Sequence, residues 1–282
     1  MISIKHRKPF RFTAGRLLVY LLLVGSSILM IIPFYWTVGT SLKLEQYVFA
    51  SPPQWWPNPL TLINFQEVIS KIRFLRYLYN STMVSFYITA GNVFFDTLAA
   101  YAFAKLKFPG RDKIFFIFLL VLMVPSQVNL IPMYRIMGSL HWIDSYLALV
   151  IPSLTSVFGI FMMRQFLMSI PDELLDAARI DGCNEFNVFL KVVIPLAIPG
   201  IATLIILTFM GAWNDFLWPR IVINSDNLFT LPLGLAQLQM KNTSNQAQIM
   251  AGTVLTALPM IIVFLFMQRQ FIEGMTAGAL KE

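Results

Sequence analysis

The chain has 282 residues, of which 57% are hydrophobic and only 12% are charged. An ordinary soluble domain carries about 25% charged residues, so this composition excludes a conventional water-exposed surface and predicts a membrane protein. The formal net charge of +7 does not indicate nucleic-acid binding, because the basic residues flank long apolar runs, as they do in loops beside membrane helices.

The N-terminal residues are basic and lead into a first apolar run, Leu17–Val38. A secretory signal has an apolar region of about 7–15 residues and a cleavage site of small residues. The run here is longer and lacks such a site. We therefore expect an uncleaved first membrane helix, preceded by a cytoplasmic segment at residues 1–16.

Five further apolar runs follow, each near the roughly 20 residues that cross a bilayer. Two polar stretches interrupt them, Gly39–Tyr79 and Asn224–Gln246, and both are expected to be loops. The sequence therefore predicts an all-α membrane protein with six transmembrane helices. The five later helices are expected at Asn80–Ala104, Ile114–Tyr134, Ile143–Phe166, Leu196–Trp218 and Ile249–Met267.

Six crossings place both termini on one side of the membrane. If that side is cytoplasmic, the inside segments hold about twice as many Lys and Arg residues as the outside segments, which agrees with the positive-inside rule. We therefore expect cytoplasmic termini, one transmembrane domain over residues 17–271, and a cytoplasmic tail over residues 272–282. The segment 169–191 is then also cytoplasmic.

That segment has a helix–glycine–helix pattern. Pro171 and Asp172 make a suitable helix start, and acidic residues in the first turns suit the helix dipole. Gly182 is expected to end the first helix, and a short amphipathic piece follows at residues 184–191. From the residues alone, this hairpin is either a docking surface for another protein or a plain amphipathic loop.

The stretch from Pro171 to Pro195 resembles the Glu-Ala-Ala motif of ABC importer permeases, in which the triplet leads to a glycine and then to an Ile-x-x-Pro-like end. Asp176 stands where the family usually has Glu. The resemblance implies a type I ABC importer permease fold, whose coupling helix, at about residues 171–191, docks on a separate ATPase. It also implies that Asp176 pairs with a basic residue of that ATPase. The implied docking residues are Asp176, Ala177, Ala178, Asp181 and Gly182.

Three other stretches resemble the carbohydrate branch of these permeases, and especially the smaller channel subunit of maltose-type importers. They are residues 101–110, 213–219 and 268–282. The resemblance implies a sugar-importing subunit, multi-pass in a bacterial-type inner membrane. The implied partners are a second homologous permease, two ATP-binding-cassette ATPases, an extracytoplasmic solute-binding protein and membrane lipid. ATP and Mg would be used by the ATPases, because this chain has no G-x-x-x-x-G-K-[ST] phosphate loop.

Three polar residues in the apolar runs are candidates for a translocation path. Asp96 lies mid-run in the second helix, where a charge costs about 2.5–3.5 kcal/mol on insertion scales, so it either lines a path or is bonded within the bundle. Asn214 and Asp215 lie near the end of the fifth helix, where a structural or cavity-edge role is favoured over direct sugar contact. Trp213 and Trp218 beside them are typical of an interfacial aromatic belt.

The residues indicate no metal site, no bound cofactor and no catalysis. Cys183 is the single cysteine, and His6 and His141 lie far apart without neighbouring ligands. Two other functions stay open: a secondary transporter coupled to an ion through Asp96, and a non-transporting membrane anchor or enzyme subunit. The first is disfavoured by the small number of helices and by the 171–195 loop, which such carriers do not need.

Overall fold

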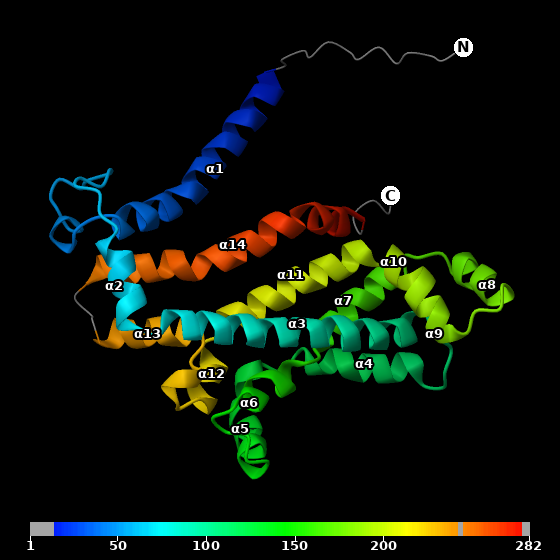
Figure 1. The fold of residues 1–282 in the computed structure, drawn as a ribbon. Coiled ribbons are helices and arrows are strands. Elements are labelled where there is room, and N and C mark those ends of the chain that lie inside the picture. The colour runs from blue at the N-terminus through cyan, green and yellow to red at the C-terminus, as the bar shows by residue number, and fades with distance from the viewer. Residues whose placement is uncertain (1–13, 242–244, 278–282) are drawn as a thin grey trace. The chain divides into compact units, whose positions relative to one another are not determined.

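The computed structural model describes residues 14–241 and 245–277, and all regular structure in these ranges is helical, as predicted (Figure 1). The described residues form two compact units. The first unit holds residues up to 67 together with 245–254, and the second holds residues 68–241 and 255–277.

The first unit contains an apolar helix that is exposed along most of its length, which suits contact with lipid. Its loops are ordered by polar contacts: the Glu45 carboxylate accepts hydrogen bonds from the backbone N–H groups of Gln246 (3.0 Å) and Ala247 (2.8 Å), which caps a helix N-terminus. The elements that contribute to this unit are α1 (Ala14–Ser41), the 3₁₀ turn η1 (Glu45–Tyr47), α2 (Ile63–Lys71) and the start of α14 (Gln246–Ala277).

The second unit is built around α3 (Phe74–Lys105), which packs along α7 (Val157–Leu167), α11 (Ile198–Asn214) and α13 (Leu231–Lys241) (Figure 1). With 32 residues, α3 is about 48 Å long at roughly 1.5 Å per residue, which is enough to cross a bilayer. Its buried face is partly polar. These polar groups face neighbouring helices, so α3 is a packed central helix.

The predicted third helix is broken in the structure, so the prediction of one continuous helix was wrong. It forms α4 (Arg111–Val121), the 3₁₀ turn η2 (Ser126–Asn129) and α5 (Leu130–Ser139), with a bend of 89° between the two halves. Pro125 stands at the break with φ of −57° and ψ of 131°. Proline has no backbone N–H with which to continue the helix, which explains why the chain turns here.

The fourth and fifth predicted helices are also interrupted. The fourth consists of α6 (Tyr146–Val150), the 3₁₀ turn η3 (Ile151–Ser153) and α7. The fifth ends at Asn214, because Asp215 has extended backbone, and a separate helix, α12 (Leu217–Val222), follows it. Both breaks expose backbone and polar side chains next to α3, where they form the site described below.

Both segments expected to be loops contain helices. Within Gly39–Tyr79 lie α2 and the start of α3, and all of α13 lies within Asn224–Gln246. The reason is tertiary packing: Leu231 and Leu233 of α13 are each 1% exposed and belong to the core cluster. The last helix, α14, runs to Ala277, past the expected start of the tail at residue 272, and residues 278–282 lie outside the described range.

By length and composition, three described helices could cross a membrane, and up to five could do so if each bent pair is one span. The three are Leu17–Ser41, Tyr146–Leu167 and Gln246–Arg269, and the bent pairs cover residues 111–139 and 185–214. The central helix α3 is long enough, but its polar residues keep it out of this set. The structure is therefore a helical protein with several apolar helices.

Candidate functional site

The predicted hairpin is present as α8 (Asp172–Ile180) and α9 (Glu185–Val188), joined through Gly182 (Figure 1). Gly182 has φ of +85°, a left-handed conformation that glycine adopts without a Cβ penalty. Its backbone N–H donates to the carbonyl of Arg179 at 3.0 Å, closing the end of α8. The side chain of Asn184 caps α9 by accepting from the Asn187 N–H at 2.9 Å. The helix–glycine–helix prediction is confirmed.

One face of the hairpin is buried against the ends of α3 and α7. Leu175 is 1% exposed and Val188 is fully buried, and both belong to one apolar cluster. Ala178 and Cys183 are half-buried and pack against the same cluster. Ala178, which was grouped with the docking residues, therefore contributes mainly to the inner face.

Outside this buried face, three large apolar side chains of the hairpin are exposed: Ile180 at 85%, Phe186 at 63% and Leu174 at 46%. Four of the predicted docking residues lie exposed in the same hairpin: Asp176, Ala177, Asp181 and Gly182. Apolar side chains gathered beside small residues favour protein–protein contact. Motif reasoning missed Ile180 and Phe186, although large apolar residues in a charged hairpin were a readable signal.

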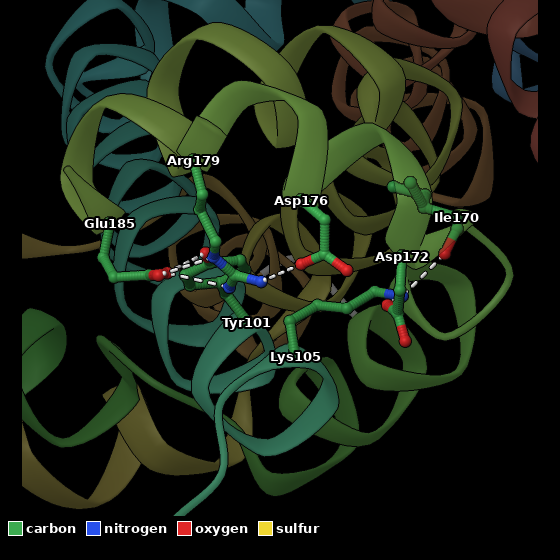
Figure 2. Close-up of polar contacts among 7 residues, drawn as sticks. All are labelled: Tyr101, Lys105, Ile170, Asp172, Asp176, Arg179 and Glu185. Atoms are coloured by element: carbon green, nitrogen blue, oxygen red, sulfur yellow. Dashed lines mark hydrogen bonds and ion pairs between the residues drawn. The ribbon is translucent and has the colours of Figure 1, made fainter. Parts of the chain in front are cut away.

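A polar network ties α8 to α9 and to α3, as Figure 2 shows. Arg179 donates to the Asp176 carboxylate at 2.8 Å and to the Glu185 carboxylate at 2.8 and 3.2 Å. The Tyr101 hydroxyl on α3 donates to Glu185 at 2.7 Å. The hydrogen bonds to Glu185, and then to Asp176, raise the pKa of Arg179 above its usual value. Asp176 is thus already paired within its own helix.

A second contact joins the end of α3 to the start of α8 (Figure 2). The Lys105 side chain is only 4% exposed, and its Nζ donates to the Ile170 carbonyl at 2.6 Å and to the Asp172 carboxylate at 2.5 Å. The hydrogen bond from Lys105 lowers the pKa of Asp172 below the usual carboxyl value. A buried ammonium group held by two oxygens fixes the point at which the hairpin begins.

Asp96 is fully buried in the middle of α3 and supports the start of α7. Its carboxylate accepts from the Thr155 hydroxyl (2.6 Å) and from the backbone N–H (3.0 Å) and hydroxyl (3.1 Å) of Ser156, the N-cap of α7. A negative charge at a helix N-terminus is favourable. Gly159 makes the approach feasible, because a Cβ there would lie 2.1 Å from Asp96 Oδ2.

A cleft of about 900 Å³ lies beside this anchor, where α3, η3, α7 and α11 meet. Asn214 and Asp215 both line it, as does the Thr155–Ser156 pair that Asp96 holds. Asp96 itself is not among the lining residues. The polar residues that line the cleft are Asn92, Ser153, Thr155, Ser156, Thr208, Asn214 and Asp215.

The two predicted cavity residues at the end of α11 make few contacts. Asn214 is exposed, and its Nδ2 donates to the Met210 carbonyl at 2.9 Å. Asp215 is half-buried and accepts a long contact, 3.4 Å, from the Trp218 backbone N–H. Within the residues that the structure describes, no group of three or more His, Cys, Asp or Glu side chains is placed to hold a metal ion.

The prediction of an aromatic belt at Trp213 and Trp218 was wrong. Trp213 is 1% exposed and its Nε1 donates to the Thr256 carbonyl at 3.0 Å, and Trp218 is 7% exposed and donates to the Ala148 carbonyl at 2.8 Å. Because both rings are buried and each indole N–H has a backbone carbonyl partner, both act as core residues. They hold the end of α11 in place beside the cleft.

Comparisons with known proteins agree with this geometry. The family model described as "Binding-protein-dependent transport system inner membrane component" matches residues 96–276. The arabinooligosaccharides transport system permease protein AraQ of Halalkalibacterium halodurans is 37% identical over 226 residues, covering 80% of this chain and 81% of AraQ. The sn-glycerol-3-phosphate transport system permease protein UgpE of Shigella flexneri is 32% identical over 263 residues, covering 90% and 93%.

A solved structure shares the fold. It is a bacterial ABC transporter involved in the import of the acidic polysaccharide alginate, and one of its chains matches with a TM-score of 0.79 at 22% identity. The match covers 94% of this chain and all of that chain. The prediction of an ABC importer permease fold is confirmed at this level.

Proposed function

We propose, because this chain belongs to the family of binding-protein-dependent transport system inner membrane components, that it forms one half of the channel of an ATP-driven importer in a bacterial inner membrane. The proposed cargo is a sugar or a sugar-like solute, such as an oligosaccharide or a glycosylated polyol. The names of the relatives AraQ and UgpE support this cargo class.

The proposed topology has six crossings and cytoplasmic termini. The crossings are α1, α3, the bent pair at 111–139, the interrupted helix Tyr146–Leu167, the bent pair at 185–214, and α14. The distribution of basic residues supports the orientation, which puts the hairpin in the cytoplasm. The other half of the channel would be a second, homologous permease, and an extracytoplasmic binding protein would deliver the solute.

The observation that carries the proposal is the hairpin, which packs against the rest of the second unit on one face and exposes apolar side chains on the other. Its inner face is held by the cluster around Leu175 and by Lys105, while its outer face exposes Ile180 and Phe186. We propose that two ATPase subunits bind ATP and Mg, and that one of them binds this outer face of the hairpin. A hairpin fixed to α3 would then transmit the closure of the ATPases to the helices, switching the channel between inward- and outward-open packings.

The cleft between α3 and α11 is the proposed part of the solute path in this subunit. Asn214 and Asp215 line it directly. Asp96 is proposed to support the path by holding Thr155 and Ser156 in its wall. The groups that donate hydrogen bonds to Asp96 hold α7 against α3. This structural role speaks against Asp96 as the ion-coupling group of a secondary transporter.

The test is transport by the assembled complex, reconstituted in liposomes with its ATPases and binding protein. Asp176→Lys and Ile180→Glu should each leave the complex assembled but reduce ATP-driven uptake by roughly tenfold or more, because each places an unmatched charge on the docking face. Glu173→Lys, the same charge change on the same helix outside the predicted docking residues, is the matched control. Full uptake by both docking-face variants would contradict the proposal.

A further inference from the structure

The charge of the cleft wall bears on which solutes the cleft can hold. Asp215 is the one ionisable side chain among the residues that line it, all of which lie in the described part of the chain. No Lys, Arg or His is among them. A phosphate or carboxylate entering this cleft would therefore lose water without gaining a countercharge, which is costly for an anion.

Several polar groups in the wall have hydrogen-bonding capacity that the fold does not use. The side chains of Ser153 and Thr208 make no hydrogen bond within the described residues, and Asp215 receives only backbone N–H groups of its own turn, those of Leu217 and Trp218. In contrast, the Asn92 side chain donates to the Ser153 carbonyl at 2.6 Å, so the fold already uses it. The unused groups are hydroxyls and a carboxylate, which pair with the O–H groups of a polyol.

The unused groups and the apolar surface face the same space. Thr208 and Gly211 are three residues apart on α11, and Asp215 directly follows the end of that helix, so all three lie along the cleft wall. Phe158 and Phe216, which are 51% and 37% exposed, add aromatic surface to the wall. A sugar ring has an apolar C–H face and a rim of hydroxyls, and this wall offers a partner for each.

We infer that the cleft admits an uncharged, polyhydroxylated solute and discriminates against sugar phosphates and uronates. This inference rests on the proposed function and narrows its cargo from sugar-like solutes in general to neutral ones. We assign this selectivity to the carboxylate of Asp215, which repels anions. The cleft wall has no cation that would offset this repulsion.

The first experiment measures the local charge without needing the natural cargo. Gly211→Cys, in a Cys183→Ser background, places a thiol one turn from Asp215 at a position where an added Cβ meets no atom within 4 Å. In the purified complex, a cationic methanethiosulfonate reagent should modify this thiol faster than an anionic one, by roughly tenfold or more after correction for intrinsic rates. Adding Asp215→Asn should remove most of that preference.

Gly138→Cys on α5 is the matched control, because it is also a glycine with open space at its Cβ and does not line the cleft. Its reagent preference should not respond to Asp215→Asn. A preference at position 211 that is equal in both Asp215 forms, or that favours the anionic reagent, would overturn the role assigned to Asp215.

The second experiment measures transport by the reconstituted complex with arabinotriose, glycerol 3-phosphate and trigalacturonate as probes. We expect uptake of the neutral trisaccharide to exceed uptake of either anion by at least tenfold, and Asp215→Lys to shrink that ratio. If an anionic probe is carried as well as the neutral one, the inference fails while the proposed function stands. If no ATP-driven uptake of any saccharide occurs, with the cleft thiol behaving as expected, the proposed function fails instead.

Discussion

In the hairpin, the carboxylates of Asp172, Asp176 and Glu185 each lie within 2.8 Å of a cation, whereas Asp96 and Asp215, in the same unit, make no ion pair within the described residues. The hairpin cations are Lys105 and Arg179. Asp96 is instead surrounded by hydroxyl and backbone donors, and Asp215 has only its own turn. The same side-chain chemistry thus occurs in three different environments.

The difference separates the tasks of these carboxylates. Ion pairs that join α3, α8 and α9 hold the hairpin in place, because each carboxylate lies beside a cationic side chain. Donors without a cation fix α7 against α3 at Asp96. The carboxylate left over, that of Asp215, is the one that faces a cleft, where a solute can supply the missing partner.

The largest expected effect is on stability, and it comes from replacing the two carboxylates that make no ion pair, those of Asp96 and Asp215, by amides of the same shape. Asp96→Asn should lower the stability of the complex by about 2–3 kcal/mol, because an amide N–H₂ group would face the Thr155 and Ser156 donors and leave buried groups unpaired. Asp215→Asn should cost less than about 0.5 kcal/mol. Denaturant titration of the purified complex measures both, and equal losses would show that the two sites do not differ as described.

A smaller effect is expected from removing the contact between α3 and the start of the hairpin while the docking face stays unchanged. Lys105→Met keeps the buried stem of the side chain but removes the hydrogen bonds to Ile170 and Asp172, so uptake per ATP hydrolysed should fall by roughly five- to tenfold. ATP hydrolysis itself should persist. Lys107→Met, at an exposed position close by, is the control and should behave as wild type. If Lys105→Met transports with normal stoichiometry, the contact is not part of the coupling.

The sequence predicted the helical class and the hairpin, because hydropathy and the helix–glycine–helix pattern are local signals. It misplaced the ends of the helices at Pro125 and Asp215, where the chain breaks inside an apolar run. It also missed α13, because Leu231 and Leu233 become buried only against distant parts of the chain. Local hydropathy cannot show such packing.

The candidate site was predictable in its residues but not in their partners. Asp176, Asn214 and Asp215 were identified from their positions in motifs or apolar runs. The pairing of Asp176 with Arg179, and the burial of Trp213 and Trp218, depend on the three-dimensional arrangement. Asp96 was recognised as anomalous, and only the contact with Thr155 and Ser156, about 60 residues away, distinguishes its two interpretations.

The smallest expected effect is the pH response of the contact between Lys105 and Asp172. The folded-state pKa of Asp172 is lowered, so its contribution to hairpin stability is present above the unfolded-state value of about 4 and is lost as pH falls through the folded-state value. Hydrogen exchange of α8, corrected for intrinsic rates, should therefore stay constant from about pH 8 to pH 5. The difference in protection between wild type and Lys105→Met should be less than about threefold, since Asp172 is 75% exposed and well screened, and should shrink once the pH falls below the unfolded-state value. A difference that persists there would mean that Lys105 acts mainly through the Ile170 carbonyl, which does not titrate.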